Sequence, residues 1–191
     1  MKKWKISLNA PMVLTFAALS FAAMLLHYFS SGKTDMLLFM TYHSSLREPL
    51  TYVRFFTHVL GHADWGHYIG NMAYLLLLGP ILEEKYGSLR VFQVIAITAV
   101  VTGVLNYVLF PNVALCGASG VCFAFILWAA YTGFRQREIP LTFILVAAIF
   151  IGQQIYEGVT IQNNISNMSH IVGGIVGSVA GFALNRKRGK R

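Results

Sequence analysis

The chain has 191 residues, of which 56% are hydrophobic and only 12% are charged. A soluble globular domain normally carries about 25% charged residues, so this composition excludes an ordinary water-soluble domain and favours a chain embedded in a bilayer. The formal net charge is +8. Nucleic-acid binding is disfavoured, because the basic residues are scattered over loops and tails without an accompanying aromatic platform.

Six apolar blocks approach the length of a membrane span. They run roughly from Ala10 to Tyr28, Tyr68 to Leu82, Val91 to Phe110, Cys116 to Phe134, Leu141 to Ile155 and Met168 to Leu184. Because open sheets leave backbone groups unpaired in lipid, we expect helices. The sequence therefore predicts one all-α membrane domain over residues 1–191, a bundle of six transmembrane helices with short basic tails.

The basic residues orient this bundle. If both termini are cytoplasmic, all lysines and arginines except Lys33, Arg47 and Arg54 fall in inner segments, which is a strong positive-inside bias. The first block also fits a cleavable signal peptide, since lysines precede it, but its long apolar run favours a retained helix. Cys116 and Cys122 both lie in or beside the fourth block, so a disulfide framework is not expected.

The segment Ser30–His67 connects the first two blocks on the outer side. It mixes charged residues with many aromatic and aliphatic ones. This composition predicts a partly helical loop lying at the level of the lipid headgroups. A plain connector is the alternative, and the length of the segment disfavours it.

Two polar residues inside the apolar blocks point to chemistry. Ser119 lies between Gly117 and Gly120 at the outer start of the fourth block, and His170 lies at the outer end of the sixth. The glycines that follow His170 at helical spacing are Gly173, Gly177 and Gly181. Glycines let helices approach closely, so we expect the hydroxyl and the imidazole within hydrogen-bonding reach, as activation of a serine requires. Taken alone, Ser119 fits helix packing and His170 fits an interfacial residue.

A second polar pair lies in the second block. His67 and Asn71 are four residues apart and share one helical face. Together with the backbone N–H of Ser119, these side chains predict an oxyanion hole. The alternatives are a helix cap or a polar contact with a neighbouring helix. His58 and His62 extend the cluster into the loop, so a metal site is a further alternative.

Other intramembrane protease chemistries lack their residues. No histidine is followed by glutamate, as an H-E-x-x-H zinc site requires. The aspartates, Asp35 and Asp64, lie in the first outer loop and cannot form a membrane-embedded dyad. The spans contain no lysine for a Ser-Lys dyad. A serine paired with a histidine remains.

These motifs resemble those of the rhomboid intramembrane serine proteases, in their basic six-helix bacterial form, from Arg54 to Gly181. The G-x-S-G motif appears as Gly117–Gly120, and H-x-x-x-N appears as His67–Asn71, preceded by His62. The H-x-x-G-x-x-x-G motif appears as His170, Gly173 and Gly177. Each motif alone is weak, whereas three in order on the expected spans are a specific signal.

The resemblance implies that Ser119 is the nucleophile and His170 the general base, without a third acid. His67, Asn71 and the Ser119 amide would form the oxyanion hole. The implied supporting residues are Gly117, Gly120, Phe123, Gly173, Gly177, His62, Arg54 and Glu83. Departures from the family pattern are Val53 for a Trp beside Arg54, Phe123 for a Tyr beneath the imidazole, and Ser169 for an Ala before His170.

The sequence thus predicts an intramembrane serine endopeptidase that cleaves transmembrane segments of membrane proteins through an acyl-enzyme. No metal, nucleotide, other cofactor or nucleic acid is implied, and we expect a multi-pass protein of the bacterial inner membrane. Two other classes stay open. A histidine-rich transporter or metal-binding protein would explain His58, His62 and His67 but not Ser119. A non-catalytic binder of transmembrane helices would explain the groove but not the pairing of Ser119 with His170.

Overall fold

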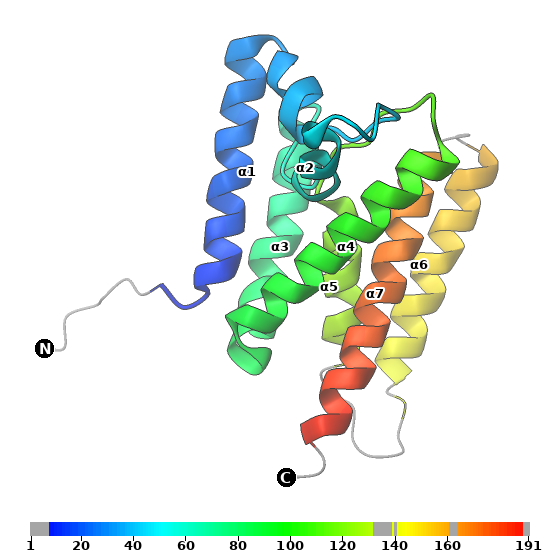
Figure 1. The fold of residues 1–191 in the computed structure, drawn as a ribbon. Coiled ribbons are helices and arrows are strands. Elements are labelled where there is room, and N and C mark those ends of the chain that lie inside the picture. Colours follow the sequence, from blue (N-terminus) through cyan, green and yellow to red (C-terminus); the bar gives the residue numbers. More distant parts are fainter. Residues whose placement is uncertain (1–7, 132–138, 140, 161–163, 189–191) are drawn as a thin grey trace, which may run out of the picture.

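The computed structural model describes residues 8–131, 139, 141–160 and 164–188. Every regular element within these ranges is a helix, which confirms the predicted all-α class (Figure 1). In chain order they are α1 (Pro11–Ser30), the π-helical turn η1 (Asp35–Phe39), α2 (Pro49–Thr57), α3 (Trp65–Tyr86), α4 (Ser88–Leu109), α5 (Ser119–Ala130), α6 (Leu141–Thr160) and α7 (Asn164–Arg188). We call the end of the bundle that carries η1 and α2 the outer end, and the opposite end the inner end.

Three helices are each long and apolar enough to cross a membrane: α1, α4 and the Asn167–Asn185 part of α7. α5 is a shorter apolar helix. The other two predicted spans, Tyr68–Leu82 and Leu141–Ile155, lie within the longer helices α3 and α6. That α3, α5 and α6 also cross the membrane, which would make six spans in all, stays a prediction.

The predicted start of the fourth span is wrong. We expected the fourth span to begin at Cys116, but α5 begins at Ser119. The φ angle of Gly117 is +127°, a conformation that side-chain-bearing residues rarely adopt, and a helix cannot pass through it. The predicted end of that span, Phe134, lies outside the described residues, and α5 ends at Ala130.

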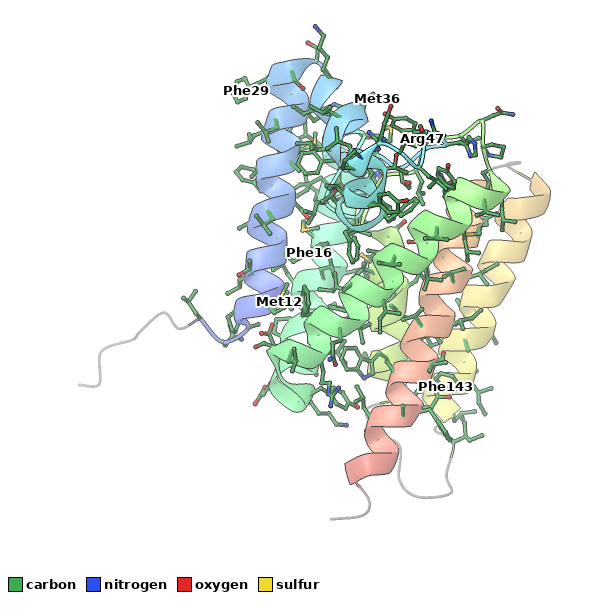
Figure 2. All side chains as sticks on the ribbon, in the orientation of Figure 1. Met12, Phe16, Phe29, Met36, Arg47 and Phe143 are labelled. Carbon is green, nitrogen blue, oxygen red and sulfur yellow. The ribbon has the colours of Figure 1, made fainter. Side chains whose placement is uncertain are left out.

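Buried apolar side chains from α1, α3, α4 and α5 form the core between these helices. Its largest fully buried members are Trp128, Phe125, Met24 and Leu75. Large apolar side chains also cover the outward faces of the helices; examples are Leu19, Leu77, Ile97, Ile149 and Val179. A soluble protein rarely exposes so much apolar surface, whereas a bilayer requires it. Figure 2 shows the side chains along the bundle, from Phe29 near the outer end to Phe143 near the inner end.

A buried carboxylate ties the start of α1 to the inner end of α3. Pro11 begins α1, and the next two backbone N–H groups, of Met12 and Val13, donate to Glu83 at 2.8 and 3.0 Å. The hydroxyl of Ser88, at the start of α4, donates to the same carboxylate at 2.6 Å. N–H groups in the first turn have no acceptor within their own helix, and a negative group there also complements the helix dipole. Glu83 therefore joins α1, α3 and α4.

A second set of contacts at the inner end joins α3, α5, α6 and α7. The ring of Tyr86 packs against Trp128 with centroids 4.8 Å apart, and its hydroxyl donates to Asn185 Oδ1 at 2.9 Å. The amide of Asn185 donates to the carbonyl oxygen of Tyr131. The Tyr131 ring in turn packs against Phe143 at 4.1 Å. We call these five residues the inner-end cluster.

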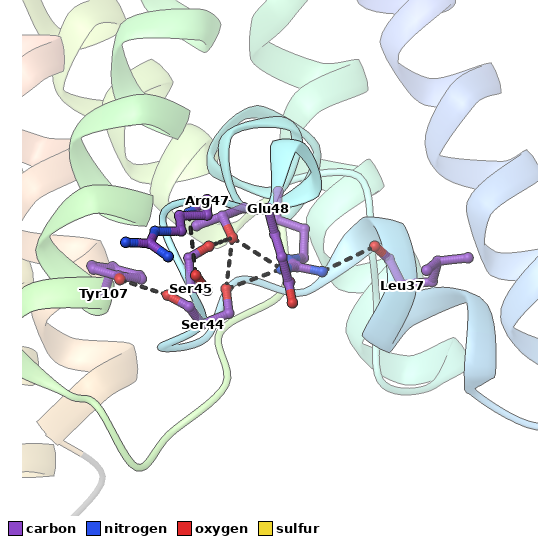
Figure 3. Close-up of polar contacts among 8 residues, drawn as sticks. Leu37, Ser44, Ser45, Arg47, Glu48 and Tyr107 are labelled. Carbon is purple, nitrogen blue, oxygen red and sulfur yellow. Dashed lines mark hydrogen bonds and ion pairs between the residues drawn. The ribbon is translucent and has the colours of Figure 1, made fainter.

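The outer loop packs around the buried guanidinium of Arg54. Figure 3 draws polar contacts of this loop, with Leu37, Ser44 and Tyr107 labelled. Arg54 is 2% exposed and donates to the carbonyl oxygen of Leu37 and to the hydroxyls of Ser44 and Thr51, at 3.4, 3.0 and 3.3 Å. The hydroxyl of Tyr107 on α4 donates to the carbonyl oxygen of Ser44 at 2.6 Å. The loop is thus partly helical, as predicted. Arg54 holds separate segments of the loop together, although an exposed Val53 replaces the tryptophan of the family pattern.

The Glu83 contact predicts a stability effect. Glu83→Ala leaves one buried and one partly buried N–H group without acceptors, so we expect the free energy of unfolding to fall by about 2–4 kcal/mol. Thermal unfolding of the purified protein in detergent measures this loss. The matched control is Glu84→Ala, because Glu84 is the neighbouring carboxylate but is exposed. Equal melting temperatures for the two variants would contradict the anchoring role.

Candidate active site

The segment before Ser119 is fixed by the outer loop. Thr41 and Leu115 exchange both of their backbone hydrogen bonds, at 2.9 and 2.8 Å. The N–H of Gly117 donates to the carbonyl oxygen of His58 at 2.9 Å. The side chain of Asn106 on α4 donates to the carbonyl oxygen of Thr41 at 3.3 Å. The loop therefore holds the segment in one position directly before the nucleophile candidate.

Ser119 is the first residue of α5. The first hydrogen bond of this helix runs from the N–H of Cys122 to the carbonyl oxygen of Ala118, at 2.9 Å. The N–H of Ser119 therefore has no acceptor within the helix, and the positive end of the helix dipole lies beside it. Such an N–H can donate to a negative oxygen that forms next to the serine.

Gly117 gives His67 room to lie over this turn. A Cβ atom at Gly117 would be 2.6 Å from Cε1 of His67 and 2.8 Å from its Nε2. With a φ of +127° as well, this position excludes a side chain on two separate grounds. The close approach brings the imidazole of His67, from α3, to the start of α5.

The backbones of α5 and α7 touch. A Cβ atom at Gly173 would overlap the carbonyl oxygen of Gly120, and one at Gly177 would overlap that of Ala124. At the outer end of the contact, a Cβ at Gly120 would be 3.2 Å from the carbonyl oxygen of Ser169. Gly120 and Ser169 are the chain neighbours of Ser119 and His170. The predicted close packing therefore places the serine and the histidine at the same level of the bundle.

Ser119 and His170 line one cavity of about 510 Å³. The cavity also has His67 and Asn71 of α3 in its wall, and α6 closes one side with Val146 and Ile149. Phe123 lies one turn below Ser119, and its ring centroid is 4.2 Å from that of His170. This contact restricts the orientation of the imidazole without offering it a hydrogen bond.

Asn71 brings an unused donor to the cavity. The residue is 7% exposed, and its side-chain Nδ2 has no hydrogen-bond partner among the described residues. A buried donor without a partner costs free energy, so its presence calls for an explanation. An oxygen that becomes negative during a reaction in the cavity would satisfy it.

His62 supports His67 from the outer loop. The two rings are 5.1 Å apart at their centroids and nearly perpendicular. Nδ1–H of His62 donates to the carbonyl oxygen of Leu60 at 3.1 Å. Burial, together with the neighbouring His67, lowers the pKa of His62 to about 4, so its ring is neutral near pH 7. A neutral ring packs against His67 without adding a positive charge to the site.

His58 makes its side-chain contacts with α2 and α4. Its Nδ1–H donates to the carbonyl oxygen of Arg54 at 3.1 Å, and its Nε2 lies 3.2 Å from Oγ1 of Thr102 on α4. Within the described part of the chain, no three His, Cys, Asp or Glu side chains gather as a group that could hold a metal ion. The arrangement of the histidines therefore gives the metal-site alternative no support.

The structure thus brings Ser119, His170, His67 and Asn71 to one cavity, whereas Arg54 and Glu83 lie outside it in the loop and at the inner end. Sequence reasoning assigned no part to Cys122, which also lines the cavity. Its spacing could have revealed this position, because a residue three places after Ser119 in a helix lies on the same face. No sequence signal reveals the bond from Gly117 to His58, because backbone groups carry it.

Taken together, these features define a helical membrane protein with a serine and a histidine on one cavity. The family description "Rhomboid domain" matches residues 49–187. The chain therefore belongs to the rhomboid family, which is known for intramembrane serine proteases, and it is an integral membrane protein.

Several known proteins are similar to this chain. Rhomboid protease GlpG of Haemophilus influenzae is 26% identical over 167 residues, covering 82% of this chain and 83% of GlpG. Rhomboid-related protein 2 of Mus musculus is 30% identical over 161 residues, 73% of this chain. Rhomboid-related protein 1 of Caenorhabditis elegans is 27% identical over 140 residues, 69% of this chain. The chain spans only 53% of the mouse protein and 39% of the nematode protein.

A side chain at Gly117 should disable the site. Gly117→Ala forces a strained φ, at a cost on the order of 1–3 kcal/mol, and pushes the ring of His67 away from Ser119. We expect at least a ~10-fold loss of cleavage of a reporter membrane substrate in proteoliposomes. The control is Gly152→Ala, where a Cβ meets nothing within 4 Å. A fully active Gly117→Ala protein would show that the contact with His67 does not matter.

The buried His58 predicts a pH effect on stability. Burial lowers its pKa to about 4, whereas an unfolded histidine titrates near 6.5. Between these values the unfolded state binds more protons, so stability falls as the pH falls, by about 2 kcal/mol at pH 5. Melting temperatures at pH 7.5 and pH 5 measure this effect.

A matched pair of variants tests the assignment to His58. In His58→Gln, the difference between the melting temperatures at pH 7.5 and pH 5 should be smaller than in the unmodified protein. His43→Gln, which replaces an exposed histidine of the same loop, should keep the full difference. The same pH dependence in both variants would contradict the assignment.

Proposed function

We propose that this protein is an intramembrane serine endopeptidase that cleaves transmembrane segments of other membrane proteins. One observation carries the proposal: Ser119 and His170 line the same cavity, at the point where the backbones of α5 and α7 touch. Membership in the rhomboid family supports it. Polar residues inside a bilayer are costly, so their convergence on one cavity favours a function over chance.

In the proposed reaction, Oγ of Ser119 attacks a backbone carbonyl carbon of the substrate while a ring nitrogen of His170 accepts the hydroxyl proton. The carbonyl oxygen becomes negative. The N–H of Ser119, Nδ2 of Asn71 and the ring of His67 surround the place where this oxyanion forms.

When the tetrahedral intermediate breaks down, the imidazolium of His170 gives its proton to the leaving amine, and an ester links the substrate to Ser119. Water then attacks this ester with His170 again as the base, which releases the second product and restores the hydroxyl. Phe123 keeps the imidazole in place against its ring through both steps. No acidic residue takes part.

The substrate is a membrane protein whose transmembrane helix reaches the cavity sideways through the bilayer. Val146 and Ile149 of α6 form one side of the cavity. A substrate helix that enters from that side must pass α6. A peptide bond in a helix is shielded by its own hydrogen bonds, so the segment must unwind before Ser119 can attack. We further propose a bacterial inner membrane, with the cavity facing outward and both chain ends in the cytoplasm, as the distribution of basic residues favours.

Two substitutions test the proposal. Ser119→Ala and His170→Ala remove the nucleophile and the base, so each should abolish cleavage of a single-span reporter in proteoliposomes while the melting temperature stays near that of the unmodified protein. A fluorophosphonate probe should label the unmodified protein at Ser119, as located by mass spectrometry, and should not label Ser119→Ala.

The outcomes separate the proposal from its rivals. Undiminished cleavage by Ser119→Ala would refute the assignment of the nucleophile. Retention of the reporter by a protein that neither cleaves it nor reacts with the probe would identify a binder of transmembrane helices. Loss of cleavage on adding a chelator would point to metal chemistry.

A further inference from the structure

Cys122 lies between the nucleophile candidate and the oxyanion-hole candidate. It is one helical turn after Ser119, 2% exposed, and part of the cavity wall. Its Sγ is 3.4 Å from the backbone oxygen of Asn71 and 3.6 Å from the side-chain Oδ1 of the same residue. Both distances are within the range of thiol hydrogen bonds, and both acceptors belong to one asparagine.

The thiol lies between two oxygen atoms of Asn71, and its contact with Oδ1 favours one orientation of the side-chain amide. A thiol donates through its S–H, so it favours Oδ1 of Asn71 as its neighbour over the Nδ2 group. With Oδ1 facing Cys122, Nδ2 faces the other way, and it is the buried donor that has no partner in the described structure. A flipped amide would turn Oδ1 toward a negative oxygen, which repels it.

We propose that Cys122 is a positioning residue: its thiol holds the carboxamide of Asn71 in the orientation that aims Nδ2 at the oxyanion. The inference rests on the proposed protease function, and it adds a residue that does not touch the substrate's reacting atoms. It also explains why Nδ2 is left without a protein partner, since its acceptor is the oxygen of the reacting substrate.

The competing explanation is simple packing, because a buried cysteine is also a small apolar side chain. The two explanations differ in their coupling to Asn71. If Cys122 acts through the amide, its loss has no effect once the amide is gone. If Cys122 only packs, its loss has the same effect with or without the amide.

The kinetic test compares the unmodified protein with Cys122→Ala, Asn71→Ala, the double variant and Cys122→Ser. We expect Asn71→Ala to lower kcat by ~10²–10³, as loss of one oxyanion donor does. Cys122→Ala should lower kcat ~3- to 10-fold, the size of one neutral hydrogen bond, with KM unchanged. The double variant should match Asn71→Ala, and Cys122→Ser should recover most of kcat because a hydroxyl also donates.

Equal losses from Cys122→Ala in both backgrounds would overturn the proposal, and so would a Cys122→Ser protein as slow as Cys122→Ala. Melting temperatures of all variants identify any change in kcat that arises from unfolding.

A second measurement needs no activity, so it separates this inference from the proposed function. In a Cys116→Ser background, where Cys122 is the remaining thiol of the chain, the infrared S–H stretching band reports the hydrogen bond. We expect the band to shift to higher frequency in Asn71→Ala. An unshifted band would show that the thiol does not use the side chain of Asn71, whether or not the protein cleaves a substrate.

Discussion

The contact between the backbones of α5 and α7 is the constraint on which the site depends. A proton passes from a hydroxyl to an imidazole only over hydrogen-bond distance, and ordinary side chains at a helix interface would keep the two helices too far apart. Gly173 and Gly177 remove those side chains on α7, and Gly120 meets Gly173 from α5. In a bilayer, where apolar side chains gain little by leaving lipid, such close packing is itself a main source of helix association.

The described wall of the cavity lacks acidic side chains, lysine and arginine. The residues described in its wall include Ser119, His67, Asn71 and His170, and none of the described lining residues is an Asp, Glu, Lys or Arg. Charges inside a bilayer are expensive, so the proposed dyad of Ser119 and His170, which has no acidic partner, suits a site within the membrane. The outer loop carries charged residues: its buried Arg54 donates to hydroxyls and to a carbonyl oxygen, and it lies 3.6 Å from the carboxylate of Glu48. The same loop fixes the segment before Ser119.

The sequence predicted what short-range patterns encode. The apolar blocks predicted the helices, the topology predicted that Ser119 and His170 lie at similar depth, and the spacing of the glycines predicted the close approach of their helices. Contacts between distant segments were harder to predict, because they depend on how helices pack. Nothing in the spacing of Glu83 shows that it binds the N–H groups of Met12 and Val13. The start of α5 was missed because the conformation of Gly117 is set by His67 and the outer loop together.

The inner-end cluster has a mechanical consequence. Tyr86, Trp128, Asn185, Tyr131 and Phe143 link α3, α5, α6 and α7 below the cavity by ring contacts and amide hydrogen bonds. Around the cavity itself, α6 contributes apolar side chains, which exchange contacts with protein for contacts with lipid at little cost. These contacts stiffen the inner end of the bundle, whereas the side of the cavity that α6 forms can yield more easily. If a substrate helix enters beside α6, as proposed, a tilt of α6 about Phe143 would widen the cavity at the outer end while the inner end stays closed.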